Sequence, residues 1–269
     1  MTPKKFKDTV WKYYREHGRS DLPWRKTTDP YRILVSEVML QQTQVERVIP
    51  YYTRFLKKFP TVRALAKAPL SQVLIAWQGL GYNRRAKMLH EAAKEVVRGH
   101  GGLFPRTALE LEKLPGVGPY TAHAVAAFAY NEDGICIETN IRTAVTHHFF
   151  PKGEGVPDNE VRVVLEKTFP KGQAREWYAA LMDYGAYLKR SGVRINAKAK
   201  GYAKQSTFKG SDREIRGAIV RLLSTAPAER TRILKLFEVS RRDAVEEQLM
   251  KLTHEGLTVR KGTRYQLPD

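Results

Sequence analysis

The sequence has almost no cysteine and too few acidic residues to balance its basic ones. Cys136 is the only cysteine among 269 residues, which excludes an intramolecular disulfide and any site needing several thiolates from this chain, such as a cysteine-ligated iron–sulfur cluster. Asp and Glu number 28 against 47 Lys and Arg, giving a net charge of +19. This excess indicates a polyanionic partner, with nucleic acid ahead of an anionic membrane surface.

Long apolar runs are missing as well. The longest aliphatic and aromatic runs, such as Ala124–Tyr130, are too short to span a bilayer. Met1–Gly18 is charged and amphipathic and lacks the apolar core of a signal peptide. We therefore expect a cytoplasmic, nucleoid-associated monomer with no membrane partner.

Helical patterns fill the first two-thirds of the chain and predict a mainly α fold. Asp29-Pro30 joins an N-cap carboxylate to a proline at the first helical position, which predicts a helix over Tyr31–Gln44. Only Gly134–Ile137 looks extended. Further helices are expected over 62–67, 72–77, 83–98, 107–114, 119–130, 140–149, 158–168 and 173–189.

The composition changes at Lys189–Lys209, which holds seven Lys and Arg and no acidic residue. Such a stretch is typical of a basic DNA-binding arm or of a solvated flexible connector. Ser211-Asp-Arg-Glu214 then predicts a capping box at the start of a helix. Two shorter helices over 233–237 and 244–253 follow, and then two β-prone runs over 257–260 and 263–267. This order indicates a small winged-helix-like α+β module, which either binds DNA or is an accessory bundle.

Leu114-Pro-Gly-Val-Gly118 separates two predicted helices. The proline fixes the entry, and the glycines allow a tight backbone turn and the close approach of another chain. The helix that follows would point its N-terminal N–H groups outward, where they can bind a phosphate. The alternative is an ordinary turn between two helices.

Two carboxylates lie in apolar surroundings. Glu37 shares a helix face with Ile33 and Leu40, so that burial would raise its pKa into the range of a proton donor near neutral pH. Glu138 follows an apolar run just before a predicted helix, where a carboxylate could stabilise a developing cation or orient a water. An acid and an anion flanking a glycosidic bond suit an oxocarbenium-like transition state. The alternatives are a paired carboxylate inside a helix and a carboxylate merely near a helix start.

Several motifs together carry a family resemblance. The sequence resembles the helix-hairpin-helix DNA glycosylases, and among them the MutY family of adenine DNA glycosylases, over about residues 6–187. The motifs are Leu22-Pro-Trp-Arg25, Asp29-Pro-Tyr31, Ser36-Glu-Val-Met-Leu-Gln-Gln-Thr-Gln44, Gly79-Leu-Gly-Tyr82, Gly101-Gly102 and Leu114-Pro-Gly-Val-Gly-Pro-Tyr-Thr-Ala122.

The resemblance implies a two-lobed helix-hairpin-helix glycosylase fold followed by the winged-helix-like module. Residues 22–130 would form a six-helix barrel with the hairpin, and residues 1–21 together with 131–204 would form a second helical lobe without a cluster. Residues 205–269 would form the small C-terminal α+β module.

The resemblance further implies a base excision repair enzyme that removes adenine mispaired with 8-oxoguanine or guanine from double-stranded DNA, after flipping the base out. Glu37 would protonate N7 of the adenine, while Tyr120 and Asn140 would line the catalytic pocket. Because a phenol cannot form a Schiff base, Tyr120 favours a monofunctional enzyme. DNA contacts would come from Arg25 beside the pocket, Gln41, Gln42, Gly81 and Tyr82 near the lesion, and Leu114, Gly116, Val117 and Gly118 on the phosphate backbone.

The sequence departs from the family in three places. Glu138, in Glu138-Thr-Asn-Ile141, replaces the catalytic Asp of the usual Asp-Gly-Asn-Val, and a misplacement of about 1 Å can cost about a hundredfold in rate. The four cluster cysteines expected after Met182–Ala186 are missing, so we expect no iron–sulfur cluster, no other cofactor and no metal; His147-His148 is most simply a pair at a helix end. The winged-helix-like segment stands in place of the family's Nudix-like domain.

Two other functions stay open at this point. One is a thymine or uracil mismatch glycosylase, since the hairpin and Tyr120 are shared with those enzymes, although an acid aimed at a purine N7 argues against it. The other is a catalytically inactive protein that binds mismatched DNA, in which Glu138 marks the loss of activity.

Overall fold

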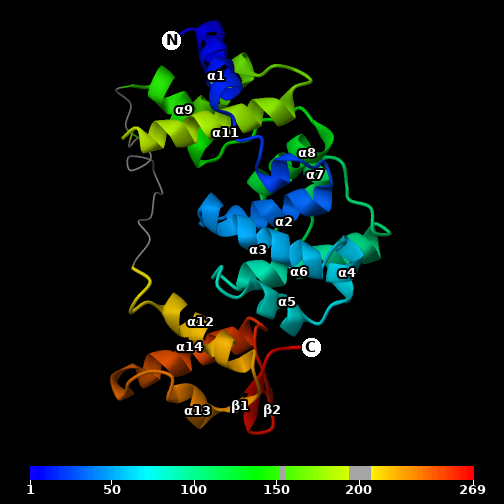
Figure 1. Cartoon of the computed structure of the whole chain (residues 1–269), viewed down its shortest axis with the longest axis vertical. Helices are drawn as coiled ribbons and strands as arrows, with labels where there is room; N and C mark the ends of the chain where they lie inside the picture. Colours follow the sequence, from blue (N-terminus) through cyan, green and yellow to red (C-terminus); the bar gives the residue numbers. More distant parts are fainter. Residues whose placement is uncertain (152–154, 194–206) are drawn as a thin grey trace. The chain divides into compact units, whose positions relative to one another are not determined.

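The computed structural model describes residues 1–151, 155–193 and 207–269, and these are mainly helical (Figure 1). They form two compact units. The first comprises Met1–Glu37, Pro105–Lys113 and Val117–Lys204, and the second comprises Val38–Phe104, Leu114–Gly116 and Gln205–Asp269. In the described ranges, no helix has both the length and the apolar character needed to cross a membrane.

The first unit is built around α11 (Ala174–Arg190), which packs against α9, α1 and α8 (Figure 1). Phe6 of α1 is fully buried and makes edge-to-face contacts with Phe149 and Trp177. Aromatic burial of this kind supplies much of the apolar area that holds such a helical layer together. The other elements of the unit are α1 (Pro3–His17), a 3-10 turn (Pro23–Arg25), the start of α2 (Pro30–Leu40), α7 (Ala108–Leu111), α8 (Pro119–Tyr130), α9 (Thr139–Phe149) and α10 (Asp158–Thr168).

A buried carboxylate ties α11 to the segment that follows α1. Asp183 is 1% exposed, and its Oδ1 accepts hydrogen bonds from Nε and Nη2 of Arg19 at 2.9 and 2.7 Å. The backbone N–H of Arg19 donates to Oδ2 at 2.9 Å. A buried charge is tolerated when it is paired and hydrogen-bonded in this way, so Asp183 fixes the path of the chain toward Arg25.

The helical part of the second unit contains α3 (Val45–Lys58), α4 (Val62–Lys67), α5 (Leu70–Trp77) and α6 (Arg84–Gly99). Trp77 is fully buried and meets Phe55 edge to face. The hairpin turn lies directly on α6, because a Cβ atom on Gly116 would come within 2.4 Å of the Cβ of Met88. Gly116 also has a φ of +73°, so both its conformation and its surroundings require glycine.

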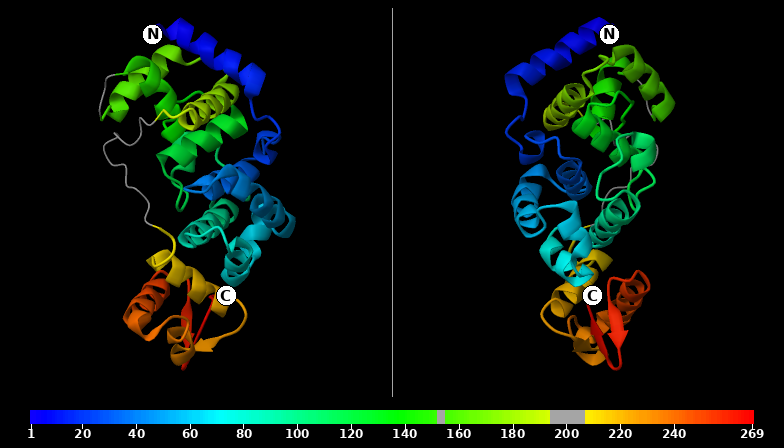
Figure 2. Two further views of the ribbon diagram at one scale, coloured as in Figure 1. Left: turned by 60° about the vertical axis from the view of Figure 1, so that its left-hand side comes forward. Right: turned by 90° about the vertical axis from the view of Figure 1, so that its right-hand side faces the viewer.

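The C-terminal module combines helices with a three-stranded antiparallel sheet of order β1-β3-β2, as a winged-helix arrangement requires (Figure 2). Ile215, Ile219, Leu249 and Leu252 form its buried core. Its elements are α12 (Asp212–Leu223), β1 (Ala228–Glu229), α13 (Arg230–Leu234), a 3-10 turn (Val239–Arg241), α14 (Arg242–His254), β2 (Val259–Lys261) and β3 (Arg264–Gln266).

Contacts within the second unit join this module to the helices before it. The backbone N–H of Ser71 donates to the carbonyl of Pro268 at 2.8 Å. The ammonium of Lys87 donates to the carbonyl of Glu255. The module is therefore packed against the ends of α5 and α6.

Some local expectations are wrong in detail. The helix predicted to reach Gln44 ends at Leu40, and no strand forms over Gly134–Ile137. The predicted capping box does not form, because the hydroxyl of Ser211 caps no backbone N–H and the carboxylate of Glu214 accepts from the N–H of Gly210 and not from that of Ser211. Strand β1 was not predicted. Residues 194–206 of the predicted basic stretch lie outside the described residues, and the three-domain division stays a prediction.

Candidate active site

Glu37 lies in the middle of α2, with its carboxyl group facing the interior of the first unit. Asp29 starts this helix by accepting a hydrogen bond from the N–H of Tyr31 at 2.9 Å. Glu37 is 6% exposed and Ile33, one turn earlier, is 1% exposed. Its Oε2 accepts a hydrogen bond of 2.9 Å from the hydroxyl of Tyr120, which stands in the first turn of α8.

The electrostatic surroundings keep a proton on Glu37 near neutral pH. Burial raises the pKa of Glu37 to about 7, and the negative charge of Glu138 adds to the rise. The hydrogen bond from Tyr120 and the positive charge of Arg25 act in the opposite direction. Burial and the neighbouring carboxylate of Glu37 raise the pKa of Tyr120 well above its usual value, so its hydroxyl stays protonated.

Glu138 is the N-cap residue of α9 and its carboxylate folds back onto the start of that helix. Its Oε1 accepts from the backbone N–H groups of Asn140 and Ile141 at 2.7 and 2.9 Å, and its Oε2 accepts from Nδ2 of Asn140 at 3.3 Å. Burial raises the pKa of Glu138, whereas these N–H donors and the cation of Lys189 lower it. The helix N-terminus therefore favours the ionised form of this carboxylate.

Asn140 is held from the opposite side by α11. Nζ of Lys189 donates to Oδ1 of Asn140 at 2.7 Å. The backbone of α11 comes so close that a Cβ atom on Gly185 would lie 2.0 Å from the carbonyl oxygen of Asn140. Neither Lys189 nor Gly185 was predicted as a site residue. Their signals in the sequence were the start of the basic stretch and the glycine of Met182-Asp-Tyr-Gly-Ala186.

Arg25 is fixed close to this site by α8 and α11. Its Nη2 lies 3.6 Å from Oδ1 of Asp183, and its guanidinium carbon lies 5.3 Å from the centroid of the Phe128 ring. Its buried Nη1 has no hydrogen-bond partner in the part of the chain that the structure describes. Arg25 therefore supplies a rigid positive charge that acts on Glu37.

Two other titratable groups of the first unit are structural. Burial raises the pKa of the Cys136 thiol well above its usual value, and the backbone N–H of Cys136 donates to the hydroxyl of Tyr178 at 3.0 Å. His148 is bound to the hydroxyl of Tyr184 at 2.7 Å, and burial lowers its pKa to about 4. Across residues 1–151, 155–193 and 207–269, no cluster of His, Cys, Asp and Glu could hold a metal ion.

The first unit thus brings together Glu37, Tyr120, Glu138, Asn140 and Arg25, all expected at the site. One carboxyl group is buried and protonated near neutral pH, and the other is bound by N–H donors that stabilise its anion. Two carboxyl groups with such different environments can divide the roles of proton donor and anionic stabiliser.

In the second unit, Arg85 gathers several of the predicted DNA contacts. Its Nη1 donates to the carbonyl oxygens of Val38 and Gln41 at 2.7 Å each, which ends α2. Its guanidinium carbon lies 5.5 Å from the ring centroid of Tyr82, and its Nη2 donates to the carbonyl of Gly81 at 3.2 Å. Arg85 was missed because its hydrogen-bond partners lie more than 40 residues away or are backbone atoms.

Gln42 and Tyr82 share an uncommon backbone conformation. Their φ values are +54° and +50°, in the left-handed region that side-chain-bearing residues rarely adopt. Such strain persists only when the surroundings impose it, and it occurs often at functional sites. The geometry agrees with a specialised role for both residues, while their contact with DNA stays a prediction.

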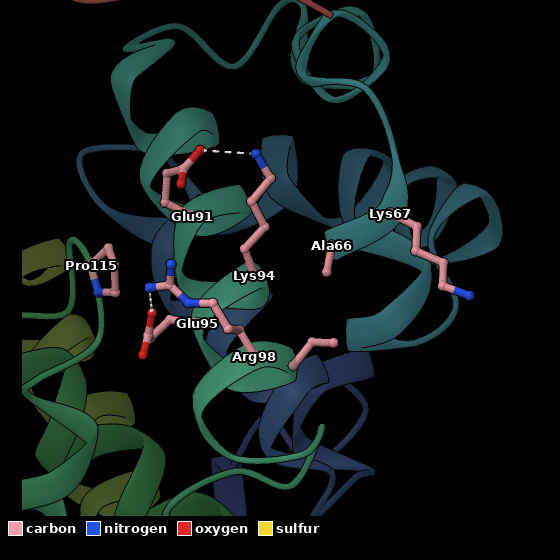
Figure 3. A pocket seen from close by; sticks show the side chains of 8 residues that line it. Ala66, Lys67, Glu91, Lys94, Glu95, Arg98 and Pro115 are labelled. Carbon is pink, nitrogen blue, oxygen red and sulfur yellow. Dashed lines mark hydrogen bonds and ion pairs between the residues drawn. The ribbon is translucent and has the colours of Figure 1, made fainter.

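The hairpin residues form the turn that the sequence predicted. Leu114 and Val117 are buried, and Gly118 is the N-cap of α8 with Pro119 at the first helical position. Beside this turn lies a groove in the second unit (Figure 3). The groove does not offer an all-positive surface, because Lys94 and Arg98 are paired with Glu91 and Glu95; it is lined by Ala66, Lys67, Glu91, Lys94, Glu95, Val97, Arg98 and Pro115.

Comparison with known proteins places these features in context. Residues 35–171 match the HhH-GPD superfamily of base excision DNA repair proteins. The adenine DNA glycosylase of Mycolicibacterium smegmatis is 34% identical over 256 residues, which cover 87% of each protein. The human adenine DNA glycosylase is 43% identical over 145 residues, or 51% of this chain and 26% of that protein. A Buchnera aphidicola relative of the same name is 35% identical over 192 residues, and the chain covers 54% of its length.

Solved structures show the same fold. A thermostable thymine-DNA glycosylase is 29% identical, with a TM-score of 0.64 over 74% of this chain and 96% of that one. A trapped endonuclease III–DNA covalent intermediate has a TM-score of 0.57 and 20% identity, over 78% and 93% of the two chains. The mainly helical helix-hairpin-helix fold expected from the sequence is confirmed.

Proposed function

The chain belongs to the HhH-GPD superfamily of base excision DNA repair proteins and is a DNA glycosylase; we propose that its substrate is adenine paired with 8-oxoguanine or guanine in duplex DNA. In this proposal the enzyme is monofunctional, acts as a monomer in the cytoplasm and leaves an abasic site in an intact strand. The adenine DNA glycosylases that are similar over 87% or more of the chain support the choice of adenine.

The observation that carries this proposal is the buried carboxyl group of Glu37, whose pKa is raised to about 7 and whose Oε2 lies 2.9 Å from the hydroxyl of Tyr120. An acid that keeps its proton at neutral pH suits the protonation of a purine leaving group. Such an acid is of less use for a pyrimidine, which has no N7.

The reaction follows from the two carboxyl groups. Glu37 donates its proton to N7 of the flipped adenine, and the electron pair of the bond from C1′ to the base leaves with the base. The carboxylate of Glu138, held at the N-terminus of α9, stabilises the oxocarbenium-like sugar. Water then adds to C1′, and its proton returns to Glu37. Because Tyr120 offers a phenol and no amine, no Schiff base forms with the sugar at that position.

We also propose that the enzyme works without the iron–sulfur cluster of its family. Four thiolates hold such a cluster, and this sequence has only Cys136, which is buried and bonded through its backbone to Tyr178. The basic stretch that stands in the place expected for cluster ligands, after Met182–Ala186, begins with Lys189, and a lysine ammonium cannot bind iron. No step of the proposed reaction passes through a cluster.

A second candidate is the removal of thymine from mismatches. The likeness to a thermostable thymine-DNA glycosylase, at 29% identity and a TM-score of 0.64, favours it. The protonated Glu37 favours the first candidate over the second, because a purine can accept its proton at N7 and a pyrimidine has no N7.

The test is single-turnover base release from duplexes with one adenine opposite 8-oxoguanine, guanine or thymine, and from a duplex with thymine opposite guanine. Heat and alkali reveal abasic sites as strand breaks. Release of adenine opposite 8-oxoguanine or guanine, and no release of thymine, is the expected result. Release of thymine alone would establish the second candidate. Selective binding of the mismatched duplexes without any release would identify an inactive binding protein.

A further inference from the structure

Lys189 connects α11 to the first turn of α9 at the candidate site. It stands in the last turn of α11, is partly buried, and donates from Nζ to Oδ1 of Asn140 at 2.7 Å. The other end of the Asn140 amide donates from Nδ2 to Oε2 of Glu138 at 3.3 Å. A continuous chain of hydrogen bonds therefore runs from the ammonium of Lys189 to the carboxylate of Glu138.

The chemistry of the ammonium fixes the direction of this chain. A lysine ammonium only donates, so it must meet the oxygen of the Asn140 side chain and not its nitrogen. That leaves Nδ2 facing the carboxylate of Glu138, where a donor is needed. Without the cation, the amide could rotate and turn its oxygen toward the carboxylate, which would repel the ionised form.

Close backbone packing between α11 and α9 fixes the geometry of this contact. Gly185 lies one helical turn before Lys189 on the same face of α11, and its Cα approaches the backbone of Asn140 so closely that a Cβ would lie 2.0 Å from the carbonyl oxygen. Because the backbones of the two helices are in contact, the ammonium of Lys189 has little freedom to approach the amide of Asn140 differently. The position of the ammonium relative to α9 is therefore set by the fold.

The charge of Lys189 also acts on Glu138 directly. Burial raises the pKa of Glu138 and the cation of Lys189 lowers it, while burial lowers the pKa of Lys189 and Glu138 opposes that change. The other ionisable groups that face Glu138 are Glu37 on α2, Tyr120 on α8 and Cys136 in the loop before α9, and Glu138 raises the pKa of each. Lys189 thus acts on Glu138 as Arg25 acts on Glu37, and the two cations offset a site rich in acidic groups.

We propose that Lys189 is a positioning residue for base release, which orients the amide of Asn140 and so holds the longer carboxylate of Glu138 in its ionised, catalytic position. This inference rests on the proposed function. It assigns a role to the segment in which the family carries cluster ligands, since here that segment supplies a cation to the catalytic pocket. It also gives a physical reason why a glutamate can serve in place of the family's aspartate.

The test compares Lys189→Gln with Lys189→Arg and with Lys167→Gln, which removes an exposed cation from α10, outside the basic stretch. Single-turnover release of adenine is measured from pH 5 to pH 9. We expect Lys189→Gln to slow release by about a hundredfold, as a misplaced catalytic group does. In the pH–rate profile of Lys189→Gln, the acidic limb, where the rate rises as Glu138 ionises, should move to higher pH. The reason is that the pKa of Glu138 is higher without the cation of Lys189. Lys189→Arg should keep the wild-type acidic limb, and Lys167→Gln should change neither the rate nor the acidic limb.

A wild-type rate and an unmoved acidic limb in Lys189→Gln would overturn the inference. Circular dichroism and thermal unfolding check that each variant is folded. If Lys189→Gln does not fold, Lys189→Arg and Lys189→Met are compared by the same profile, and equal acidic limbs in these two would also overturn it. Carbon-13 NMR titration of the Glu138 carboxyl in folded variants measures the effect of Lys189 on the pKa of Glu138, and it does not require base release. If the wild-type enzyme releases no adenine, the proposed function alone is refuted. A higher pKa of Glu138 in Lys189→Gln than in the wild type would still support the role of Lys189.

Discussion

Replacing Glu37 with glutamine removes one ionisable group from the buried site and leaves its shape in place. The new amide oxygen can still accept the hydrogen bond that Tyr120 donates to Oε2 at 2.9 Å. The change therefore separates the charge of Glu37 from its packing. It should act on stability and on activity in opposite directions.

The size of the stability effect follows from the pKa of Glu37, which rises from 4.5 to about 7 on folding. Below pH 4.5 the group is protonated in the folded and the unfolded state, so it does not lower the free energy of unfolding. Between the two values the unfolded chain ionises first, so wild-type stability falls as the pH rises. Above pH 7 the whole difference between the folded and unfolded pKa of Glu37 lowers the free energy of unfolding by about 3 kcal/mol. The Glu37→Gln variant lacks this cost, so its advantage should grow by about 2.5 kcal/mol between pH 5 and pH 8.

Urea unfolding at pH 5 and pH 8 measures this change, and any cost of burying the amide nitrogen cancels because it does not depend on pH. Base release by the same variant should fall by about a hundredfold to ten-thousandfold, the usual contribution of a general acid. Glu166→Gln on α10 is the control, since that carboxylate is exposed. A stability difference that is equal at both pH values would refute the reasoning, and so would a wild-type rate of base release.

Three further outcomes are expected. Single-turnover release by the wild-type enzyme should fall about tenfold per unit above pH 7 as Glu37 loses its proton, whereas a rate that is constant from pH 6 to pH 9 would contradict this role. Gly185→Ala should destabilise the protein by about 1 to 3 kcal/mol in urea unfolding, because its Cβ would lie 2.0 Å from the carbonyl of Asn140; Gly217→Ala, whose Cβ meets nothing within 4 Å, should not. Asp183→Asn should cost about 3 kcal/mol in the same assay, since it leaves two arginines without their buried, 1% exposed carboxylate.

The family, the mainly helical fold and the glycosylase function could be predicted because their signals are local. Asp29-Pro30 marks the start of α2 whatever the rest of the chain does, and Asp29 caps the helix as expected. The glycine of the hairpin turn is required by its own φ of +73°. The motif around Glu37 lies on one helix, so its spacing already determines which side chain faces the interior.

The features that the sequence could not reveal depend on partners far apart in the chain. α2 ends at Leu40 because Arg85, 44 residues beyond Gln41, takes up the carbonyl groups at its end. Helical propensity alone continues the pattern to Gln44. Lys189 meets Asn140 across 49 residues, and nothing in a basic stretch indicates which lysine turns inward. These are tertiary contacts, and they decide where local preferences are overridden.

The two carboxyl groups of the site show how one small region can hold an acid and an anion together. Glu37 is buried and receives one hydrogen bond from a phenol, so the effect of burial exceeds that of Arg25 and the pKa of Glu37 rises. Burial also raises the pKa of the half-buried Glu138, but two backbone N–H groups and an amide bind its carboxylate and oppose that rise. The carboxylate of Glu138 turns back over the start of its own helix, where the helix dipole favours its charge. Two similar side chains are thereby placed in different surroundings, one that favours the neutral acid and one that supplies donors to an anion, and acid-assisted cleavage of a glycosidic bond requires both.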